Sequence, residues 1–491
     1  MKFDIQHTIT ILTVPSSATI RQVMQAIDRG ALGIALIVEP ETEHFVGLVT
    51  DGDVRRALLR DCGLESQVLA IKHLPSVTAP MGTPVEQLLN LLEGDIKIVP
   101  LLDADGKVAD LVRLDRHVRL PVAEPSIGER ELQYVSECIL TGWISSAGKF
   151  VTQFEQQFAA FCNTSHAVAV SNGTVALHLA LEVLGIGSGD EVIIPSLTFA
   201  ATANAVIHTG ATPVMVDCTL DTWTIDPVAI AAHITPKTKA IIPVHLYGHP
   251  ADMDPIMELA TQHGLFVIED AAEAHGARYK GKPVGSLGDI GCFSFYGNKI
   301  VTTGEGGMLT LNNVTWDSRA RVLRDHGMDK QRRYWHTEIG YNYRLTNLQA
   351  AIGVAQMERI EQTLDKRADL AATYRRMLAD VPGITFPPAA PWAEPVCWLY
   401  SILIDKNLAG FSRDTLMSAL GAEGIDARPF FFPLSAMPIY ADHARLTNNY
   451  LVTDEISACG VSLPSSLKIG ERDIATIRET MLLLRAAAMK S

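Results

Sequence analysis

The chain has 491 residues and a formal net charge of −14, and 47% of its residues are hydrophobic. This length predicts roughly two to four domains, each with a packed core. The charge is negative and no long run of lysine and arginine interrupts it. A polyanion would therefore be repelled on average, which argues against a nucleic acid as partner. A small anionic ligand stays compatible with the sequence, since backbone N–H groups bind phosphate locally.

Signals of secretion, membrane insertion and metal binding are missing from the sequence. The seven cysteines are scattered and form no CxxC pair, which predicts reduced thiols rather than a disulfide framework or a zinc site. The start, MKFDIQHTIT, has an early acid and lacks the apolar segment of a signal peptide. No apolar run reaches the roughly 18 residues needed to cross a bilayer. We therefore expect a cytoplasmic protein with no membrane or metal partner.

Residues 1–120 contain a degenerate internal repeat with a mixed α+β pattern. Each copy reads as a helix, an apolar strand, and a second strand that is followed by charged residues. The first copy comprises residues 19–27, 33–40 and 45–59, and the second comprises residues 83–92, 96–106 and 107–116. Each copy is too small to bury its apolar face alone, so we expect the two copies to pack together in one domain.

A segment with two prolines and a glycine, RLPVAEPSIGER (119–130), reads as a linker. After it, short apolar strands alternate with helical patterns, which predicts an α/β domain over residues 121–375 with a mostly parallel sheet. Ligand sites in such sheets form at the carboxyl ends of the strands. The expected strands are residues 166–170, 191–195, 212–217, 240–246, 265–270 and 291–296, and two of the helices between them are residues 174–185 and 255–264.

The pattern changes near residue 345. Residues 347–378 read as one long helix, and the rest alternates short strands and helices. We therefore expect a smaller C-terminal domain over residues 376–491. The glycine-rich run TTGEGG (302–307) lacks the spacing of a phosphate-binding P-loop, so it is interpreted as a tight turn.

Lys299 is the candidate nucleophile, because it follows the buried strand at residues 291–296. Desolvation lowers the pKa of an amine held in a dry pocket and favours Schiff-base formation. Alone, such a lysine is more often an exposed loop residue. Asp270 ends the strand at residues 265–270, so its side chain would point into the ligand crevice, and Ser294 lies five residues before the lysine. A carboxylate there would keep the pyridine nitrogen of pyridoxal phosphate (PLP) protonated, and a hydroxyl would bind its phosphate. Loop capping and a purely structural serine are the simpler alternatives.

A second polar group opens a helix. Ser171, Asn172, Gly173 and Thr174 directly follow the strand at residues 166–170. Free N–H groups at a helix N-terminus suit a phosphate, although an ordinary N-cap is the commoner use of these residues. Phe199 follows another strand and suits stacking on a flat ring, with a core position as the alternative.

The order of phosphate cradle, aromatic residue, carboxylate, serine and lysine resembles the DegT/DnrJ/EryC1/StrS sugar aminotransferases. The similarity extends over residues 124–491. It rests on motifs that include SNGTVALHLAL (171–181), GDEVIIPSLTFAATANAV (189–206), VIEDAAEAHGA (267–277), GSLGDIGCFSFYGNKIVTTGEGG (285–307) and GYNYRLTNLQAAIG (340–353). The resemblance implies a fold-type I PLP-dependent transferase, like aspartate aminotransferase. A sister group of dehydratases has histidine at the lysine position, so Lys299 favours transamination.

The resemblance also implies a role for each matching residue. Lys299 would bind PLP covalently and move the proton during transamination, and Asp270 would pair with the pyridine nitrogen. Glu273 would lie near the O3′ oxygen of the cofactor. The remaining cofactor contacts would come from Gly173, Thr174 and Ser294 at the phosphate, Phe199 on the ring, and Asn342 at the phosphate of a partner subunit's cofactor. That last contact implies a homodimer, or a larger assembly, with shared active sites.

The substrate follows from the resemblance only in outline. The stretches HGMDKQRRYWHTEIGYNYRLTN (326–347) and PVHLYGHPADMDPI (243–256) resemble GDP-perosamine synthases. They imply an amino acid donor such as glutamate and a GDP-linked 4-keto-6-deoxysugar, for polysaccharide or O-antigen biosynthesis. UDP- or dTDP-linked sugars stay open, because Phe432 stands where several relatives have a polar residue. A regulator without catalytic activity is a further alternative, although this chain has no basic DNA-binding head.

The N-terminal repeat resembles a pair of CBS motifs, a module that often binds adenine nucleotides. The residues that carry the resemblance are GLVTDGDVRRAL (47–58). Thr50 and Asp53 would contact a ribose, because a carboxylate accepts two hydrogen bonds from a diol. Arg55 or Arg56 would reach a phosphate. The second copy has Val112 in place of the hydroxyl and retains Asp115. A packing role without a nucleotide is an equally good interpretation.

Overall fold

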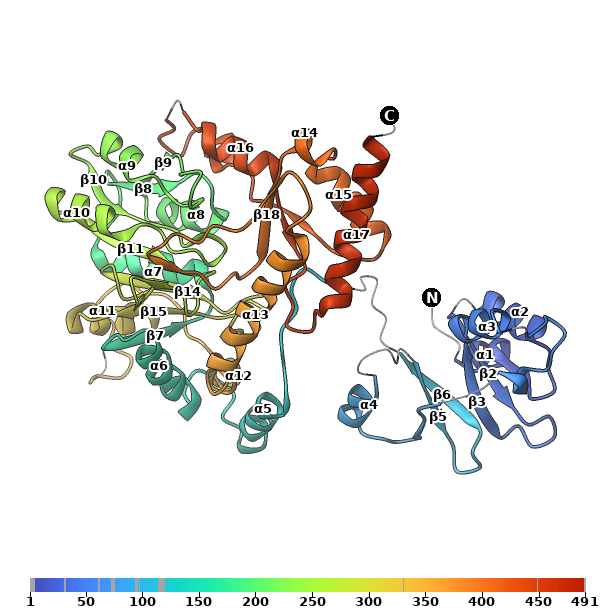
Figure 1. Cartoon of the computed structure of the whole chain (residues 1–491). Helices are drawn as coiled ribbons and strands as arrows, with labels where there is room; N and C mark the ends of the chain where they lie inside the picture. Colours follow the sequence, from blue (N-terminus) through green and yellow to red (C-terminus); the bar gives the residue numbers. More distant parts are fainter. Residues whose placement is uncertain are drawn as a thin grey trace. The chain divides into compact units, whose positions relative to one another are not determined.

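The computed structural model describes residues 5–30, 32–60, 62–71, 76–92, 96, 98–113, 120–329, 331–447 and 449–489. The chain divides into two compact units, Met1–His117 and Val118–Ser491, and Figure 1 labels the helices and strands of each. Asp115 of the second CBS-like copy lies outside the described residues. Within the described part, no helix combines the length and the apolar character needed to span a bilayer.

The first unit repeats one topology twice, as the internal repeat predicts. In each copy a three-stranded sheet has a parallel pair followed by an antiparallel pair. The first copy contains α1 (Ile5–Leu12), β1 (Thr13–Pro15), α2 (Ile20–Gly30), β2 (Ile34–Val38), β3 (Phe45–Thr50) and α3 (Asp51–Leu58), and the second contains β4 (Ala79–Pro80), α4 (Val85–Leu91), β5 (Ile98–Leu102) and β6 (Val108–Arg113).

The two copies pack against each other. Leu12 and Leu36 of the first copy share one apolar cluster with Val108 and Leu111 of the second. The backbone of Phe45 donates a hydrogen bond to the carbonyl oxygen of Gly106 at 3.0 Å. This cluster buries the apolar face that neither copy covers alone, as expected from their size.

The second unit is built on a seven-stranded sheet with the order β7-β15-β14-β11-β10-β8-β9. β15 is antiparallel to both of its neighbours, and the other pairs are parallel. This arrangement confirms the predicted α/β class and a mostly parallel sheet. The strands are β7 (His166–Val170), β8 (Glu191–Pro195), β9 (Thr212–Val216), β10 (Thr238–Ile241), β11 (Phe266–Asp270), β14 (Ile290–Ser294) and β15 (Gly307–Leu311).

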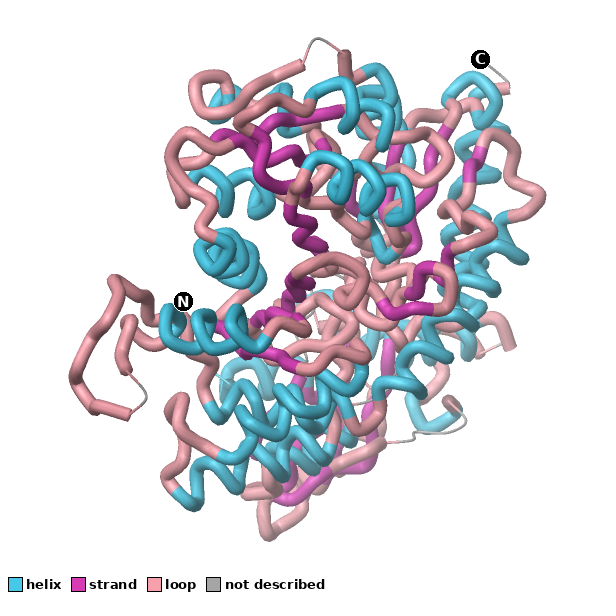
Figure 2. Tube along the Cα trace, turned by 90° about the vertical axis from the view of Figure 1, so that its left-hand side faces the viewer, coloured by secondary structure: helices cyan, strands magenta, loops and turns pink. Residues whose placement is uncertain are grey.

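Helices cover both faces of this sheet, so the strands run between helical layers in the tube view (Figure 2). Successive side chains of a strand point to opposite faces. Ile194 and Ile268 therefore pack in one cluster with α7 (Gly173–Leu184), α8 (Ala200–His208) and α11 (Val314–Arg324). Ile193 and Val267 pack on the other face with α9 (Pro227–His233) and α10 (Met253–His263). A second apolar cluster contains residues of α6 (Lys149–Phe161) and α12 (Asn347–Met357).

Three sequence expectations are corrected by this unit. β15 begins at the last glycine of the run at residues 302–307, and no strand was expected there. The strand expected at residues 240–246 ends at Ile241, because Pro243 has no N–H for the ladder and η2 (Leu246–Gly248) follows. The helix expected at residues 347–378 is two helices, α12 and α13 (Ile360–Leu378). Between them Arg359 has φ −124° and ψ 16°, outside the helical region.

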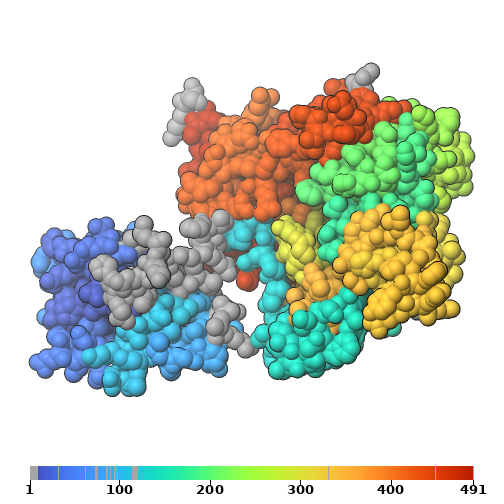
Figure 3. All heavy atoms as spheres, turned by 180° about the vertical axis from the view of Figure 1, so that it is seen from behind, coloured from blue at the N-terminus to red at the C-terminus, as the bar shows by residue number. Residues whose placement is uncertain are grey.

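The C-terminal part of this unit has a four-stranded antiparallel sheet with the order β16-β18-β20-β19. Its strands are β16 (Ile384–Thr385), β18 (Tyr400–Ile404), β19 (Arg428–Pro429) and β20 (Gly460–Leu463), and α13, α15 (Arg413–Ala422) and α17 (Glu471–Ala488) pack on them. The C-terminal residues also reach the main sheet, where Leu434 N–H donates to Ser196 O at 2.9 Å. Figure 3 shows this orange and red segment against green residues near position 200.

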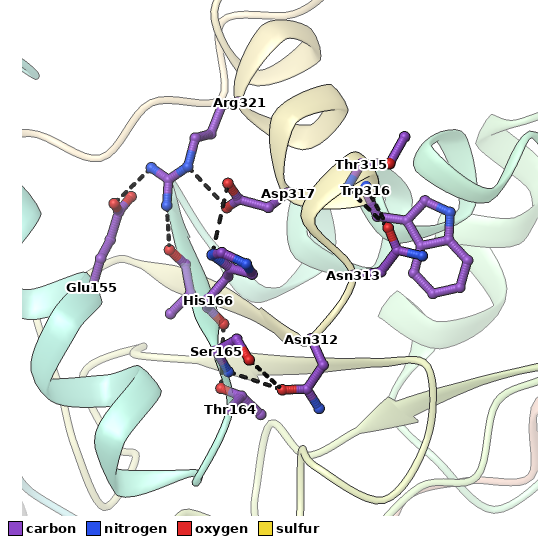
Figure 4. A network of polar contacts seen from close by, with 11 residues as sticks. Glu155, Thr164, Ser165, His166, Asn312, Asn313, Thr315, Trp316, Asp317 and Arg321 are labelled. Atoms are coloured by element: carbon purple, nitrogen blue, oxygen red, sulfur yellow. Dashed lines mark hydrogen bonds and ion pairs between the residues drawn. The ribbon is translucent and has the colours of Figure 1, made fainter.

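The buried carboxylate of Glu155 contacts β7 and α11, and Figure 4 shows its ion pair with Arg321. Glu155 of α6 accepts hydrogen bonds from Arg321 at 2.7 Å, from Arg324 at 2.6 Å and from the backbone of Ala169 at 2.9 Å. Arg321 also donates to the carbonyl oxygen of Ala167 at 2.8 Å. These contacts tie α6, α11 and β7 together, directly before the polar segment that follows β7.

We expect the Glu155→Ala variant to unfold more easily, with the free energy of unfolding lowered by about 3 kcal/mol. The substitution leaves the largely buried Arg324 without its carboxylate and leaves Arg321 with Asp317 alone, 2.9 Å away. Urea titration followed by circular dichroism measures the change. The matched control is Glu471→Ala, whose partner Arg376 is exposed, and it should cost less than about 1 kcal/mol. Equal losses in the two variants would contradict the importance of the buried contacts.

Candidate active site

Several polar groups gather at the carboxyl end of the main sheet. β14 ends at Ser294 and β11 ends at Asp270. Ser294 pairs with Gly307, which in turn pairs with Val170 at the end of β7. Register therefore puts Ser294 two strands away from the polar segment that begins at residue 171. This is the edge where the strand pattern predicts a ligand site.

The polar segment after β7 forms an open helix N-terminus beside Ser294. The side chain of Asn172 caps α7 by accepting from Val175 N at 3.0 Å. The backbone N–H groups of Gly173 and Thr174 occupy the first two helical positions, which have no acceptor within the helix. A Cβ at Gly173 would come within 2.7 Å of the Ser294 Cβ. Glycine thus allows the helix terminus and the serine to approach closely, and together they offer N–H and O–H donors for a phosphate.

Asp270 is buried, and both of its carboxylate oxygens accept hydrogen bonds. Thr202 Oγ1 donates to Asp270 Oδ2 at 2.8 Å, and Ala272 N–H donates to Oδ1 at 3.2 Å. Burial raises the pKa of the Asp270 carboxyl, whereas the bond from Thr202 lowers it. Two neutral donors therefore support the charged form in a dry environment, as expected for an acid that pairs with a ring cation.

Lys299 lies in the same interior, and 9% of its side chain is exposed. Its Nζ is 3.5 Å from Glu273 Oε1 and 3.6 Å from the centroid of the Trp398 ring. Glu273 is itself fixed, because Oε2 accepts a hydrogen bond from Tyr247 N–H at 2.8 Å. Burial lowers the pKa of the Lys299 amine, while the Glu273 and Asp270 carboxylates oppose that shift. The structure therefore holds a desolvated amine close to acids.

These groups fit PLP. A buried amine matches its aldehyde, a carboxylate with neutral donors matches its pyridine nitrogen, and the open helix terminus with Ser294 matches its phosphate. The sequence profile of the DegT/DnrJ/EryC1/StrS aminotransferase family matches residues 125–482. The chain belongs to this family. It is a PLP-dependent aminotransferase, which speaks against the alternative of a regulator without catalytic activity.

Individual relatives cover most of the second unit. The GDP-perosamine synthase of Caulobacter vibrioides is 49% identical over 72% of this chain and 95% of its own length. The dTDP-3-amino-3,4,6-trideoxy-alpha-D-glucose transaminase of Streptomyces venezuelae is 41% identical over 66% of this chain and 86% of its own length. Among solved structures, S. venezuelae DesV in complex with a ketimine intermediate has a TM-score of 0.68 and 38% identity, and the match covers 73% of this chain and 94% of DesV.

The profile of the CBS domain matches residues 4–60, which contain the first copy of the N-terminal repeat. In that copy Thr50 caps α3, and its hydroxyl donates to Asp53 Oδ2 at 2.6 Å. Arg56 pairs with Asp53, whereas Arg55 pairs with Asp51, both at 2.6 Å. The structure thus brings Thr50, Asp53 and Arg56 together and directs Arg55 to a different carboxylate.

Two cofactor residues implied by the family resemblance are exposed in this chain. Phe199 is 59% exposed and packs on Phe431, with ring centroids 5.8 Å apart. Asn342 is exposed, and its Oδ1 accepts a hydrogen bond from Arg344 Nε at 3.0 Å. Neither residue contributes to the buried cluster around Lys299 within this chain, so their cofactor contacts stay predictions.

Sequence reasoning missed three residues of this aminotransferase site, namely Thr202, Tyr247 and Trp398. Thr202 follows Phe199 by one helical turn in the motif at residues 189–206, so helical spacing was an available signal. Tyr247 acts through its backbone at φ 51°, which no side-chain pattern reveals. Trp398 comes from the C-terminal part of the chain, where no motif marked it.

The low pKa of Lys299 predicts how the cofactor-free chain captures PLP. Only the neutral amine attacks an aldehyde, so the capture rate should rise with pH and level off above the pKa of Lys299. Because burial lowers that pKa from 10.5, the midpoint should lie below 10.5. Stopped-flow absorbance measures the rate, and Lys299→Ala gives the background from exposed lysines. A midpoint at the ordinary lysine value would contradict the buried, desolvated state of the amine.

Proposed function

We propose that this aminotransferase transfers an amino group from L-glutamate to a GDP-linked 4-keto-6-deoxysugar. The acceptor would be GDP-4-keto-6-deoxymannose and the product GDP-perosamine, for the biosynthesis of a surface polysaccharide such as an O-antigen. The identity of 49% over 95% of a GDP-perosamine synthase carries the choice of sugar. The buried Lys299 amine between a carboxylate and an aromatic face carries the choice of chemistry.

In this proposal each polar group has one task. PLP, when bound, supplies an electron sink that stabilises negative charge on the carbon next to nitrogen. Asp270 would keep the pyridine nitrogen protonated, and the hydrogen bond from Thr202 orients that carboxylate. Lys299 would hold the cofactor, and its buried amine would serve as the group that carries the proton in transamination. Glu273 contacts that amine through Oε1, while Tyr247 N–H donates a hydrogen bond to Oε2 of the same carboxylate.

Binding of the cofactor is assigned to a second set of residues. The N–H groups of Gly173 and Thr174 and the hydroxyl of Ser294 would hold the phosphate, because they converge beside a helix N-terminus. Phe199 would cover the ring, since its exposed side chain lies at the N-cap of α8. With the cofactor bound, these residues would exclude water from one face of its ring.

Asn342 is proposed to serve the active site of a second copy in a homodimer. Large apolar side chains are exposed around the end of α5 (Glu129–Thr141), where Leu140 is 86% and Trp143 is 59% exposed. Exposed apolar residues that lie together are typical of an interface. Mixing the inactive variants Lys299→Ala and Asn342→Ala tests shared sites, because a mixed dimer contains one intact site. Activity that does not recover on mixing and exchange would contradict the proposal.

A dTDP-linked sugar is the second candidate acceptor, favoured by the 41% identity to a dTDP-amino sugar transaminase. Phe432 is 61% exposed, and we propose that it contributes to the choice of nucleotide sugar. The deciding experiment incubates the PLP-loaded protein with glutamate and GDP-, dTDP- or UDP-linked 4-keto-6-deoxysugars. Mass spectrometry should detect the amino sugar first from the GDP substrate. Faster turnover of another nucleotide would reject the choice of GDP.

The CBS-like unit is proposed to bind an adenine nucleotide through Thr50, Asp53 and a neighbouring arginine. Arg56 is a better candidate for the phosphate contact than Arg55, because its guanidinium contacts Asp53. A nucleotide at 100 times its Kd would stabilise this unit by about 2.7 kcal/mol. We expect AMP or ATP to raise the melting temperature of the protein and Asp53→Ala to abolish the effect. Asp51→Ala is the matched control, and an equal response of the two variants would contradict the site.

A further inference from the structure

Trp398 lies directly against the candidate catalytic lysine, although it is distant in sequence. Lys299 Nζ is 3.6 Å from the centroid of the indole ring, well within the roughly 6 Å of a cation–π contact. Trp398 is 4% exposed and the lysine side chain is 9% exposed. The contact is therefore desolvated, which is the condition under which an aromatic face attracts an ammonium group most strongly.

Two hydrogen bonds and one ring contact fix the position of Trp398 beside Lys299. Its Nε1–H donates a hydrogen bond to the carbonyl oxygen of Asn298 at 2.7 Å, and Asn298 directly precedes Lys299. The backbone N–H of Trp398 donates to Tyr247 O at 3.0 Å. The ring also stacks on the Tyr247 ring, with an interplanar angle of 18°. The hydrogen bond to Asn298 thus fixes the indole ring to the segment that carries Lys299.

Glu273 provides the other contact of the amine. Its Oε1 is 3.5 Å from Nζ, and Tyr247 N–H holds its second oxygen. Tyr247 thus supports both groups that contact the amine, through its N–H on one side and its carbonyl oxygen and ring on the other. A carboxylate and an indole face both favour the cation, whereas burial favours the neutral amine.

We propose that Trp398 is a positioning residue that, with Glu273, forms the resting place of the free Lys299 amine. In a transaminase the lysine is displaced from the cofactor whenever the amino group of a substrate takes its place. The free amine must then stay near the cofactor carbon and ready to carry a proton. The indole face attracts the cation without accepting a hydrogen bond from it, and the Glu273 carboxylate holds the amine from the other side. This inference rests on the proposed role of Lys299.

The pH midpoint of PLP capture by the cofactor-free, full-length protein tests the proposal. Removing the indole face in Trp398→Leu takes away a contact that favours the cation, so the midpoint should move down by about one pH unit, a tenfold change. Trp398→Phe keeps a weaker aromatic face, so its midpoint should lie between those of the leucine variant and the wild type. Both variants are first compared with the wild type by thermal unfolding.

The direction of the shift separates positioning from a structural role. If Trp398 only filled space, its loss would admit water and the midpoint would rise toward the ordinary lysine value. The matched control is Trp392→Leu, because Trp392 packs on Tyr279 and His249, with ring centroids 5.0 and 5.5 Å away. Its midpoint should equal that of the wild type.

A pH midpoint that rises or stays unchanged in Trp398→Leu would overturn the proposal, even if the wild type captures PLP through Lys299. Should the wild type and Lys299→Ala capture PLP alike, the role of Lys299 itself would fail, and the resting place with it. The two failures are therefore distinguishable by one set of measurements.

Discussion

Replacing Lys299 by alanine is expected to lower turnover by at least about 10³-fold. The variant loses both the group that binds the cofactor covalently and the group that moves the proton, and proton transfer alone contributes about 10²–10⁴-fold. The visible absorbance of the protein–PLP complex should shift to that of the free aldehyde. Initial rates with glutamate and the GDP-linked keto sugar, together with absorbance spectra, measure both effects.

Lys282→Ala is the matched control for this experiment, because Lys282 is an exposed lysine on β13 (Lys282–Pro283). Its turnover and spectrum should equal those of the wild type. A Lys299→Ala protein that keeps more than about a tenth of the turnover would show that another amine carries the chemistry.

Replacing Asp270 by asparagine is expected to lower turnover by about 10²–10³-fold, the range seen when one preorganised electrostatic group is removed. Asparagine keeps the shape of the side chain and can still accept the bond from Thr202. It loses the negative charge that would hold the pyridine nitrogen protonated, so the cofactor becomes a weaker electron sink. Single-turnover kinetics of the glutamate half-reaction should show the loss.

Asp289→Asn separates this charge effect from damage to β11. Asp289 accepts a hydrogen bond from Val267 N–H of that strand at 2.8 Å, and burial raises the pKa of its carboxyl. Asp289 thus contacts the strand that Asp270 ends, but it is only partly buried and lies directly before β14. Comparable kinetic losses in the two variants would contradict a special role for Asp270.

Local sequence patterns predicted the parts of the site that follow strands. Apolar runs bounded by polar residues located β7, β11 and β14 within one or two residues, and Asp270 and Ser294 end two of them. Because parallel strands end at one edge, the pattern also predicted that these groups share a side of the sheet. β15 escaped notice, since its five residues follow a glycine-rich turn and continue into polar residues without a clear boundary.

Long-range packing supplied what the sequence did not reveal. Trp398 contacts Lys299 only because the C-terminal part folds back onto the loop at residue 298, and nothing near residue 398 marks that contact. The break between α12 and α13 has a similar origin. Arg359 leaves the helical region and donates to Glu131 and to the carbonyl oxygen of Ser126. Such a partner, more than 200 positions away, cannot be found from helical periodicity.

The bond from the Trp398 indole to the Asn298 carbonyl oxygen also limits how this enzyme can be divided. Residues up to 330 contain the lysine, both acids and the helix terminus, yet the aromatic wall of the lysine comes from residue 398. A shortened chain that stops before that residue would leave the amine open to water. Engineers who wish to graft this catalytic half onto another scaffold must therefore carry the C-terminal sheet with it, or rebuild an equivalent wall.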